Sequence, residues 1–223
     1  MKIGILLPTF RRSPDDAFAA AEDAARAGLD GVFAYDHLWP MGSPERPSLA
    51  PFAILSAVAR RNTSLVVAPL VARIGLVGTG HLVEQFLTLE SLYPRRVIAA
   101  LGTGDRLSAA ENEAYGLAFQ PADERRALLS DVASRLRDDM PVWIGGGAPA
   151  TNDLARSLGV AINLWDATAS RVAEVATTGP VTWAGPAPAD LDAALDDLSA
   201  AGASWAVFSP DVGIERLVQW RER

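Results

Sequence analysis

Eight short apolar runs alternate with helical patterns along this chain, and this alternation limits the possible folds more than any other feature. The runs are almost continuously apolar, which is typical of parallel strands buried on both faces. They are Ile3–Leu7, Gly31–Tyr35, Leu65–Leu70, Val97–Leu101, Val142–Ile144, Val160–Leu164, Val181–Trp183 and Ala203–Phe208. The pattern therefore predicts eight strands that form one parallel sheet.

The segments between the runs have the periodicity of amphipathic helices. Leu128, Val132 and Leu136 recur every four residues, so that they share one helical face. A glycine, such as Gly28 or Gly159, stands where a helix should end shortly before the next run. Each predicted strand is thus followed by a predicted helix.

Repeated strand–helix units indicate a (β/α)8 TIM barrel, here with shortened loops and insertions. The 223 residues fit one domain, residues 1–223, because such barrels run to about 200–250 residues. A doubly wound open sheet is the alternative. Its usual sign is a glycine fingerprint after the first strand, where this chain has Pro8-Thr9-Phe10.

Composition excludes several classes of function. The chain has no cysteine and two histidines, His37 and His81, so neither thiolate nor HExxH metal sites are expected, and we predict no metal. A net charge of −7 without a basic tract argues against a nucleic-acid partner. No apolar run is long enough to span a membrane, and the run after Met1 is interpreted as a strand rather than a signal peptide. We expect a cytoplasmic protein.

In a barrel the active site lies at the carboxyl ends of the strands. The fifth run leads through Gly145, Gly146 and Gly147 into a helix that begins near Pro149. Free amides at such a helix start, from Gly146 to Thr151, form a site for a phosphate. The structural alternative is a tight turn that binds nothing.

Two further strand ends carry candidate groups. The fourth run ends in Gly102-Thr103-Gly104-Asp105, where glycines permit close approach of a ligand and Asp105 either acts as an acid or caps the next short helix. The second run ends in Asp36-His37. A carboxylate beside an imidazole suits proton transfer, although the pair also fits a turn cap and a packed core residue.

Three segments resemble a known family. They are Ala27–Leu38, Leu89–Asp105 and Pro141–Ala150, and the likeness extends from Met1 to about Trp165. The chain resembles the bacterial luciferase-like monooxygenase superfamily, within it the branch that uses coenzyme F420, a deazaflavin. The chain departs from this family in length: Arg137–Met140 runs almost directly into Pro141, where members carry an insertion that covers the pocket.

The resemblance implies roles for the strand ends. His37 is expected to be catalytic and Asp105 to be a second proton donor, although the family more often has glutamate there. A cis peptide bond is expected between Pro69 and Ala72. The positions that the resemblance and the glycine-rich turn assign to cofactor binding are Asp36, Pro69, Leu70, Val71, Thr103, Gly104, Gly146, Gly147, Ala148, Pro149, Ala150 and Thr151.

The resemblance therefore implies an F420-dependent oxidoreductase that transfers a hydride between the cofactor and a small organic substrate. FMN is the alternative cofactor, which would allow a luciferase-like monooxygenase. A barrel that binds the cofactor without catalysis is another alternative, because missing insertions leave a pocket open to water. A hydrolase or lyase is disfavoured by the scarcity of histidine, cysteine and lysine. The family also suggests a homodimer.

Overall fold

The computed structural model describes the backbone of residues 1–223 and every side chain except that of Leu107. Its strands are β1 (Lys2–Leu6), β2 (Gly31–Ala34), β3 (Val66–Pro69), β4 (Ala72–Arg73), β5 (Ala99–Gly102), β6 (Val142–Gly145), β7 (Ala161–Trp165), β8 (Val181–Gly185) and β9 (Trp205–Phe208). The helices are α1 (Asp15–Arg26), α2 (Pro51–Arg61), α3 (Thr79–Leu92), α4 (Ala109–Ala114), α5 (Ala122–Leu136), α6 (Pro149–Leu158), α7 (Ala169–Ala176), α8 (Leu191–Ala200) and α9 (Ile214–Arg221), with a 3-10 turn, η1 (Arg106–Ser108).

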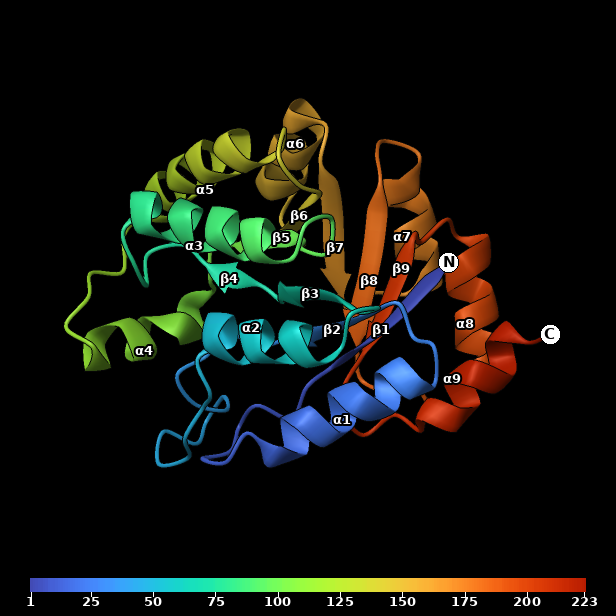
Figure 1. Cartoon of the computed structure of the whole chain (residues 1–223). Helices are drawn as coiled ribbons and strands as arrows, with labels where there is room; N and C mark the ends of the chain where they lie inside the picture. The colour runs from blue at the N-terminus through green and yellow to red at the C-terminus, as the bar shows by residue number, and fades with distance from the viewer.

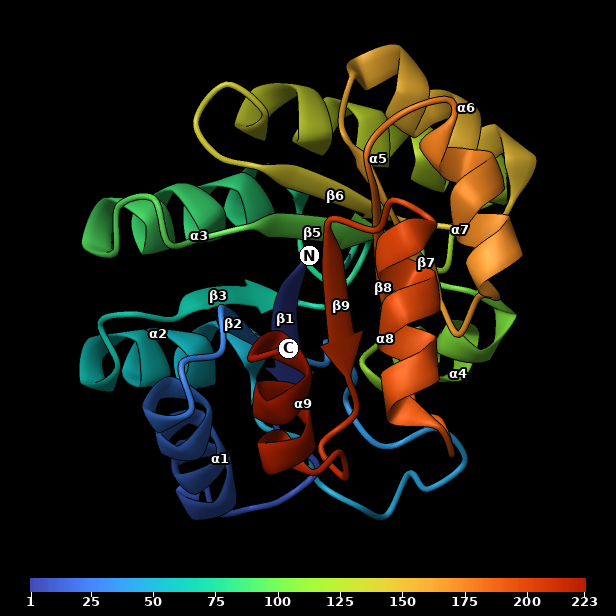
Figure 2. The same cartoon turned by 90° about the vertical axis from the view of Figure 1, so that its right-hand side faces the viewer.

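The strands form one parallel sheet in the order β3-β2-β1-β9-β8-β7-β6-β5-β4. β3 and β4 are two halves of one barrel strand, so the eight predicted strands are all present and the barrel prediction is confirmed. Helices surround the strands, and both termini lie on the same side of the molecule (Figures 1 and 2). The doubly wound sheet is excluded because the first strand, β1, pairs with the last strand, β9, and the other strands follow in chain order around the barrel.

The barrel closes between β3 and the residues that precede β5. Val67 forms a parallel bridge with Val97. The Val67 amide donates to the Arg96 carbonyl at 2.8 Å, and the Ile98 amide donates to the Val67 carbonyl at 3.2 Å. This closure leaves neither end of the strand order as an exposed edge.

Three aromatic side chains pack together with aliphatic ones in the barrel interior. The ring of Phe33 stacks on that of Trp143 with a centroid distance of 5.5 Å, and Trp205 packs edge-on against both. Two glycines make room for these rings, because a Cβ on Gly4 would lie 2.5 Å from Phe33 and one on Gly31 would lie 3.2 Å from Trp205. The outward-facing strand residues form the larger core against the helices.

The guanidinium of Arg96 holds the closure in register. Its Nε donates to the Leu65 carbonyl at 2.8 Å, its Nη1 to the Ala59 carbonyl at 3.2 Å, and its Nη2 to the Asn62 carbonyl. These carbonyls lie at the end of α2 and the start of β3, next to the bridge between Val67 and Val97 that closes the barrel.

The part of the chain that the structure describes contains no helix with both the length and the apolar character needed to cross a membrane.

Replacing Arg96 with alanine should lower the free energy of unfolding by about 2–4 kcal/mol, because hydrogen bonds to charged donors contribute about 1.5–3 kcal/mol each and the half-buried guanidinium retains some solvent contact. Urea unfolding followed by circular dichroism measures the change. The control is Arg60→Ala, an exposed arginine on α2, which should cost less than about 0.5 kcal/mol. Equal losses in the two variants would contradict the role of Arg96.

Candidate active site

A cavity of about 740 Å³ opens at the carboxyl ends of the strands. Most of the candidate residues line its wall, and Pro69, Pro149 and Ala150 do not. The candidates on the wall are Asp36, His37, Leu70, Val71, Thr103, Gly104, Asp105, Gly146, Gly147, Ala148 and Thr151. The fold thus brings together strand ends that are far apart in the sequence.

The break in the third barrel strand shapes the floor of this cavity. The Leu70–Val71 peptide bond is cis, within the segment where the family resemblance placed one. The Val71 side chain lies over two neighbouring strands: a Cβ on Gly102 would approach its Cγ2 to 2.3 Å, and one on Gly145 would approach its Cγ1 to 3.0 Å. Val71 therefore requires glycine at position 102 and favours it at position 145.

The glycine-rich turn places open backbone at the cavity wall. α6 begins at Pro149, which has no amide hydrogen, and Ala148 is the N-cap residue. Within the described residues, no backbone hydrogen bond engages the amides of Gly147 or Ala148, and a Cβ on Gly147 would meet no atom within 4 Å. The Thr151 amide, in contrast, donates to the Ala148 carbonyl at 3.0 Å. The Gly146 amide donates to the Asn163 carbonyl at 3.1 Å, so the anion-site hypothesis narrows to the amides of Gly147, Ala148 and Ala150.

Asp36 is half-buried at the wall of the cavity. Its Oδ2 accepts a hydrogen bond from the backbone amide of Arg73 at 2.8 Å. Burial raises the pKa of Asp36, and the bond from Arg73 and the charges of Arg73 and His37 oppose this rise only in part. The Asp36 carboxyl thus ties β2 to β4.

Sequence analysis missed the two residues that hold His37. His37 Nδ1 lies 2.8 Å from Oε1 of Glu111, and Glu111 Oε2 forms an ion pair with Arg73 Nη2 at 2.7 Å. Glu111 and Arg73 are each 3% exposed, whereas His37 is 28% exposed. A buried ion pair therefore fixes one edge of an imidazole whose other edge is accessible.

Arg73 also explains a glycine in the fourth strand end. A Cβ on Gly104 would lie 2.9 Å from Arg73 Cδ, and Gly104 has a φ of +69°, which favours glycine. The sequence attributed this glycine to close approach of a ligand. The structure shows that its first role is to admit the stem of Arg73.

Asp105 adopts the capping role that the sequence left open. Its Oδ1 accepts hydrogen bonds from the Ser108 amide at 3.1 Å and from the Ser108 hydroxyl at 3.2 Å, across η1. The side chain is exposed at the rim of the cavity. Asp105 and Glu111 thus differ sharply: one carboxylate is at the surface, and the other is buried against His37.

Three aromatic residues, Phe10, Tyr35 and Trp165, form another part of the cavity wall. The Tyr35 ring stacks on Phe10 at 5.1 Å between centroids and lies 6.3 Å from Trp165, which is 52% exposed. Burial, and secondarily the charge of Asp211, raises the pKa of Tyr35 to about 12. The phenol therefore stays protonated at neutral pH and can only donate or accept a hydrogen bond.

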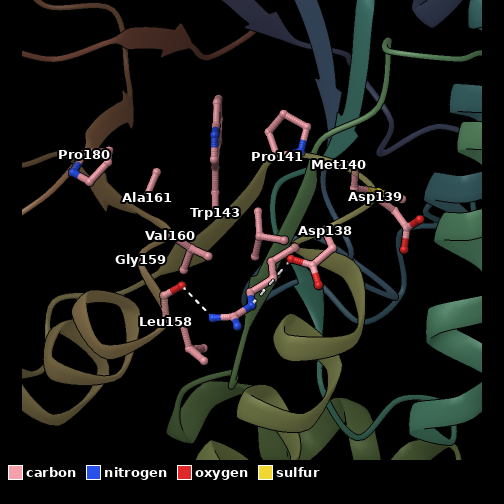
Figure 3. Close-up of a pocket in the computed structure, with 12 residues that line it drawn as sticks. Asp138, Asp139, Met140, Pro141, Trp143, Leu158, Gly159, Val160, Ala161 and Pro180 are labelled. Carbon is pink, nitrogen blue, oxygen red and sulfur yellow. Dashed lines mark hydrogen bonds and ion pairs between the residues drawn. The ribbon is translucent and has the colours of Figure 1, made fainter.

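A separate hollow of about 610 Å³ lies at the end of the barrel where the strands begin (Figure 3). Its walls come from the start of β6 and β7 and from the end of α6. Arg137 is the cation in it, and its Nη1 already donates to the Leu158 carbonyl at 3.1 Å while its Nε lies 3.9 Å from Asp138. None of the candidate residues is there, and active sites of barrels lie at the opposite face.

Among the described residues, no cluster of metal-ligand side chains exists.

Comparisons with known proteins identify the family of this chain. The model of the luciferase-like monooxygenase family matches residues 1–138, so the chain belongs to that family. The F420-dependent glucose-6-phosphate dehydrogenase of Nakamurella multipartita is 26% identical over 170 residues, which cover 64% of this chain and 49% of the relative. The F420-dependent hydroxymycolic acid dehydrogenase of Mycobacterium tuberculosis is 31% identical over 117 residues, 48% of this chain and 30% of the relative.

The fold is also found in solved structures. An F420-dependent secondary alcohol dehydrogenase in complex with an F420–acetone adduct superimposes with a TM-score of 0.80 at 14% identity, with 97% of this chain and 96% of that chain covered. This likeness establishes the fold. The chain spans about half the length, or less, of the curated relatives named above.

The geometry predicts one tautomer for His37. A carboxylate accepts only, so the neutral ring should carry its proton on Nδ1 and leave Nε2 bare. Imidazole ¹⁵N chemical shifts measure this directly, and the two histidines are assigned with a His81→Ala variant. We expect Glu111→Gln, whose amide oxygen can still accept, to keep the Nδ1–H form, and Glu111→Leu to lose it.

Both substitutions should also lower the free energy of unfolding, because Arg73 would remain buried without its charged partner. For Glu111→Leu we expect a loss of about 3–5 kcal/mol. A wild-type ring protonated on Nε2 would contradict the assigned contact. So would an unchanged tautomer in a folded Glu111→Leu protein.

Proposed function

We propose that this protein is an F420-dependent oxidoreductase that acts on a small organic substrate. The observation that carries the proposal is the pairing, in one cavity, of an open glycine-rich turn before α6 with an imidazole fixed by a buried carboxylate. The curated relatives named above are F420-dependent dehydrogenases. Because the match covers about half of these relatives, or less, the activity is inferred for this chain rather than carried over whole.

The described residues fit a ring with a phosphate-bearing tail. The amides of Gly147 and Ala148 lack partners among the described residues and would bind the phosphate at the start of α6. Val71 and Leu70 would support one face of the ring, and Thr103 offers a hydroxyl at the rim. When bound, F420 would accept or deliver a hydride at its ring, which is chemistry that no side chain supplies.

His37 would move the proton that accompanies the hydride. With Nδ1 held by Glu111, the accessible Nε2 is the atom that would take a proton from a substrate hydroxyl or return it to a carbonyl. The Glu111 carboxylate would stabilise the imidazolium form, and Arg73 would balance the charge of that carboxylate. Asp105 remains the second candidate for the acid, at the rim.

FMN is the second candidate cofactor, because it shares the fused ring and a phosphate tail, and the family takes its name from monooxygenases. A reduced flavin reacts with oxygen, whereas a reduced deazaflavin does not. Titration with each cofactor followed by fluorescence, then an oxygen-uptake measurement with the reduced complex, separates the two.

The cytoplasmic location and the homodimer remain predictions. Light scattering at micromolar concentration tests the dimer.

Gly147→Val should weaken cofactor binding by about tenfold or more. The added side chain meets no protein atom within 4 Å at Cβ, so the fold should be kept while the phosphate loses one or two charge-assisted hydrogen bonds, of about 1.5–3 kcal/mol each. Fluorescence titration gives the dissociation constant. The matched control is Gly179→Val, where a Cβ also meets nothing within 4 Å but which lies before β8, away from the cavity. Unchanged affinity in a folded Gly147→Val protein would refute the phosphate site.

His37→Ala should lower turnover by about 10²–10⁴-fold, the usual contribution of a general acid or base, while cofactor affinity changes much less. Asp105→Asn keeps the shape but cannot exchange a proton, so it tests the rim acid separately. Steady-state kinetics and cofactor titration on the same samples give both quantities. Near-normal turnover in both variants would overturn the proton assignment. Cofactor binding without turnover in any form would favour the non-catalytic alternative.

A further inference from the structure

Helix α4 is held in place by polar rather than apolar side chains. Of its residues, only Glu111 and Asn112 are buried, and no side chain caps its first turn. Figure 1 shows α4 at the periphery of the molecule. Burial of an apolar face is what usually fixes a helix against its neighbours, and α4 has no such face. Its position therefore depends on what Glu111 and Asn112 bind.

Glu111 connects α4 to the candidate active site. Its Oε1 lies 2.8 Å from His37 Nδ1, and its Oε2 forms the ion pair with Arg73. Oε2 also accepts a hydrogen bond from the Leu38 amide at 3.3 Å. A shift of α4 by about 1 Å would take the carboxylate out of hydrogen-bond range of the imidazole. The state of His37 therefore depends on how firmly α4 is held.

Asn112 anchors the other side of α4. Its Nδ2 donates to the carbonyl of Gly75, in the segment after β4, at 3.4 Å and to the carbonyl of Ala118, before α5, at 3.0 Å. Its own carbonyl accepts from the amides of Tyr115 at 3.1 Å and Leu117 at 2.9 Å. One residue thus joins α4 to the chain after β4 and to the chain that leads to α5.

The chemistry of these contacts requires an amide side chain. Both acceptors are backbone carbonyls, and the NH₂ group of asparagine has two donors to offer them. The Asn112 Oδ1 atom is buried without a partner among the described residues, so the NH₂ group makes the hydrogen bonds of this side chain. Aspartate has the same shape as asparagine but cannot donate when ionised, and leucine has a similar volume but no donor.

We propose that Asn112 is a positioning residue for His37. By holding α4 to Gly75 and Ala118, it keeps the Glu111 carboxylate against Nδ1 and so leaves Nε2 free for the proton that accompanies the hydride. Asn112 acts through Glu111 and is not among the residues that line the cavity at the strand ends. This proposal rests on the function proposed above and adds to it a residue that controls the imidazole from a distance.

Imidazole ¹⁵N chemical shifts test the proposal without requiring turnover. Asn112→Leu and Asn112→Asp remove the two donors, so both should move His37 away from the Nδ1–H form, in the direction expected for Glu111→Leu. The Leu38 amide gives a second readout because it is bonded to Glu111. Its hydrogen exchange should become faster in the same variants, since release of α4 opens this bond locally.

Asn62 provides the matched control. It is also a buried asparagine, and its Nδ2 donates to the Val58 carbonyl at 3.2 Å at the end of α2. Asn62→Leu therefore removes a comparable buried hydrogen bond at a position that does not line the cavity. It should lower stability in a similar way but leave the ¹⁵N shifts of His37 and the exchange of the Leu38 amide as they are in the wild type.

A further variant keeps the test decisive if Asn112→Leu and Asn112→Asp do not fold. Asn112→Ser introduces no charge and no steric conflict, and its hydroxyl has one donor, so at most one of the two carbonyls is bound. The ¹⁵N shifts of His37 should move in the same direction as in the other variants, by a smaller amount.

Turnover shows the functional consequence. In the Asn112 variants kcat should fall by up to about 10²-fold, the loss that an ångström-scale misplacement of a catalytic group can cause. The dissociation constant of F420 should stay close to that of the wild type, because Asn112 does not line the cavity. A general loss of stability would not by itself separate kcat from cofactor affinity in this way.

Wild-type ¹⁵N shifts in a folded Asn112→Leu or Asn112→Asp protein would overturn the proposal. Equal changes at His37 in Asn62→Leu would do so as well, because the effect would then reflect stability alone. Failure of the proposed function has a different signature, which is no binding of F420 to the wild type, whatever the His37 shifts are. Normal F420 binding and turnover with unchanged His37 shifts in the Asn112 variants would refute the positioning role alone.

Discussion

The break in the third barrel strand is the constraint on which the site depends. β3 closes the barrel through Val67 and ends at Pro69. Two residues separate it from β4, which begins at Ala72 and pairs with β5. Between these halves the Val71 side chain lies over the strand ends, where it requires glycine at position 102 and favours it at position 145. The chain just after the break places the guanidinium of Arg73 inside the protein, where a buried charge needs a partner.

The pairing of that guanidinium links three separate elements. Arg73 on β4 binds Asp36 through its backbone and Glu111 on α4 through its side chain, and Glu111 in turn binds His37. One buried network thus connects the ends of β2 and β4 to a short helix that otherwise has few contacts with the barrel. The ion pair between Arg73 and Glu111 holds the Glu111 carboxylate against Nδ1 of His37, while the buried Arg73 Nε has no hydrogen-bond partner among the described residues.

The short connection before β6 does not shape the cavity. Arg137 to Met140 joins α5 to β6 at the other end of the barrel, where it lines the hollow of Figure 3, so an insertion here would not cover the cavity. At the rim of the cavity itself, the apolar side chains of Met41 and Trp165 are exposed. A bound cofactor would bury these side chains and exclude water from the site.

The sequence by itself determined the strands, the helices that follow them and the glycine-rich turn before α6. These features are local: apolar runs, helical periodicity and glycine at sharp turns each act within a few residues. Local pattern also placed Asp36 and His37 at a strand end, because the carboxyl ends of parallel strands meet at one face. The family resemblance added the position of the cis peptide bond.

Only the tertiary structure decided what surrounds His37. Its partner Glu111 is 74 residues away, on a helix whose sequence, AAENEA, has no feature that distinguishes one glutamate from the other. Arg73 stands in a run that looks like any apolar strand end, and its burial follows from the ion pair rather than from its neighbours in the chain. Likewise Asp105, which spacing made an equal candidate for acid and cap, is engaged by Ser108 because η1 turns back onto it. Contacts between distant segments have no periodic signature, since they depend on the path of the backbone in space.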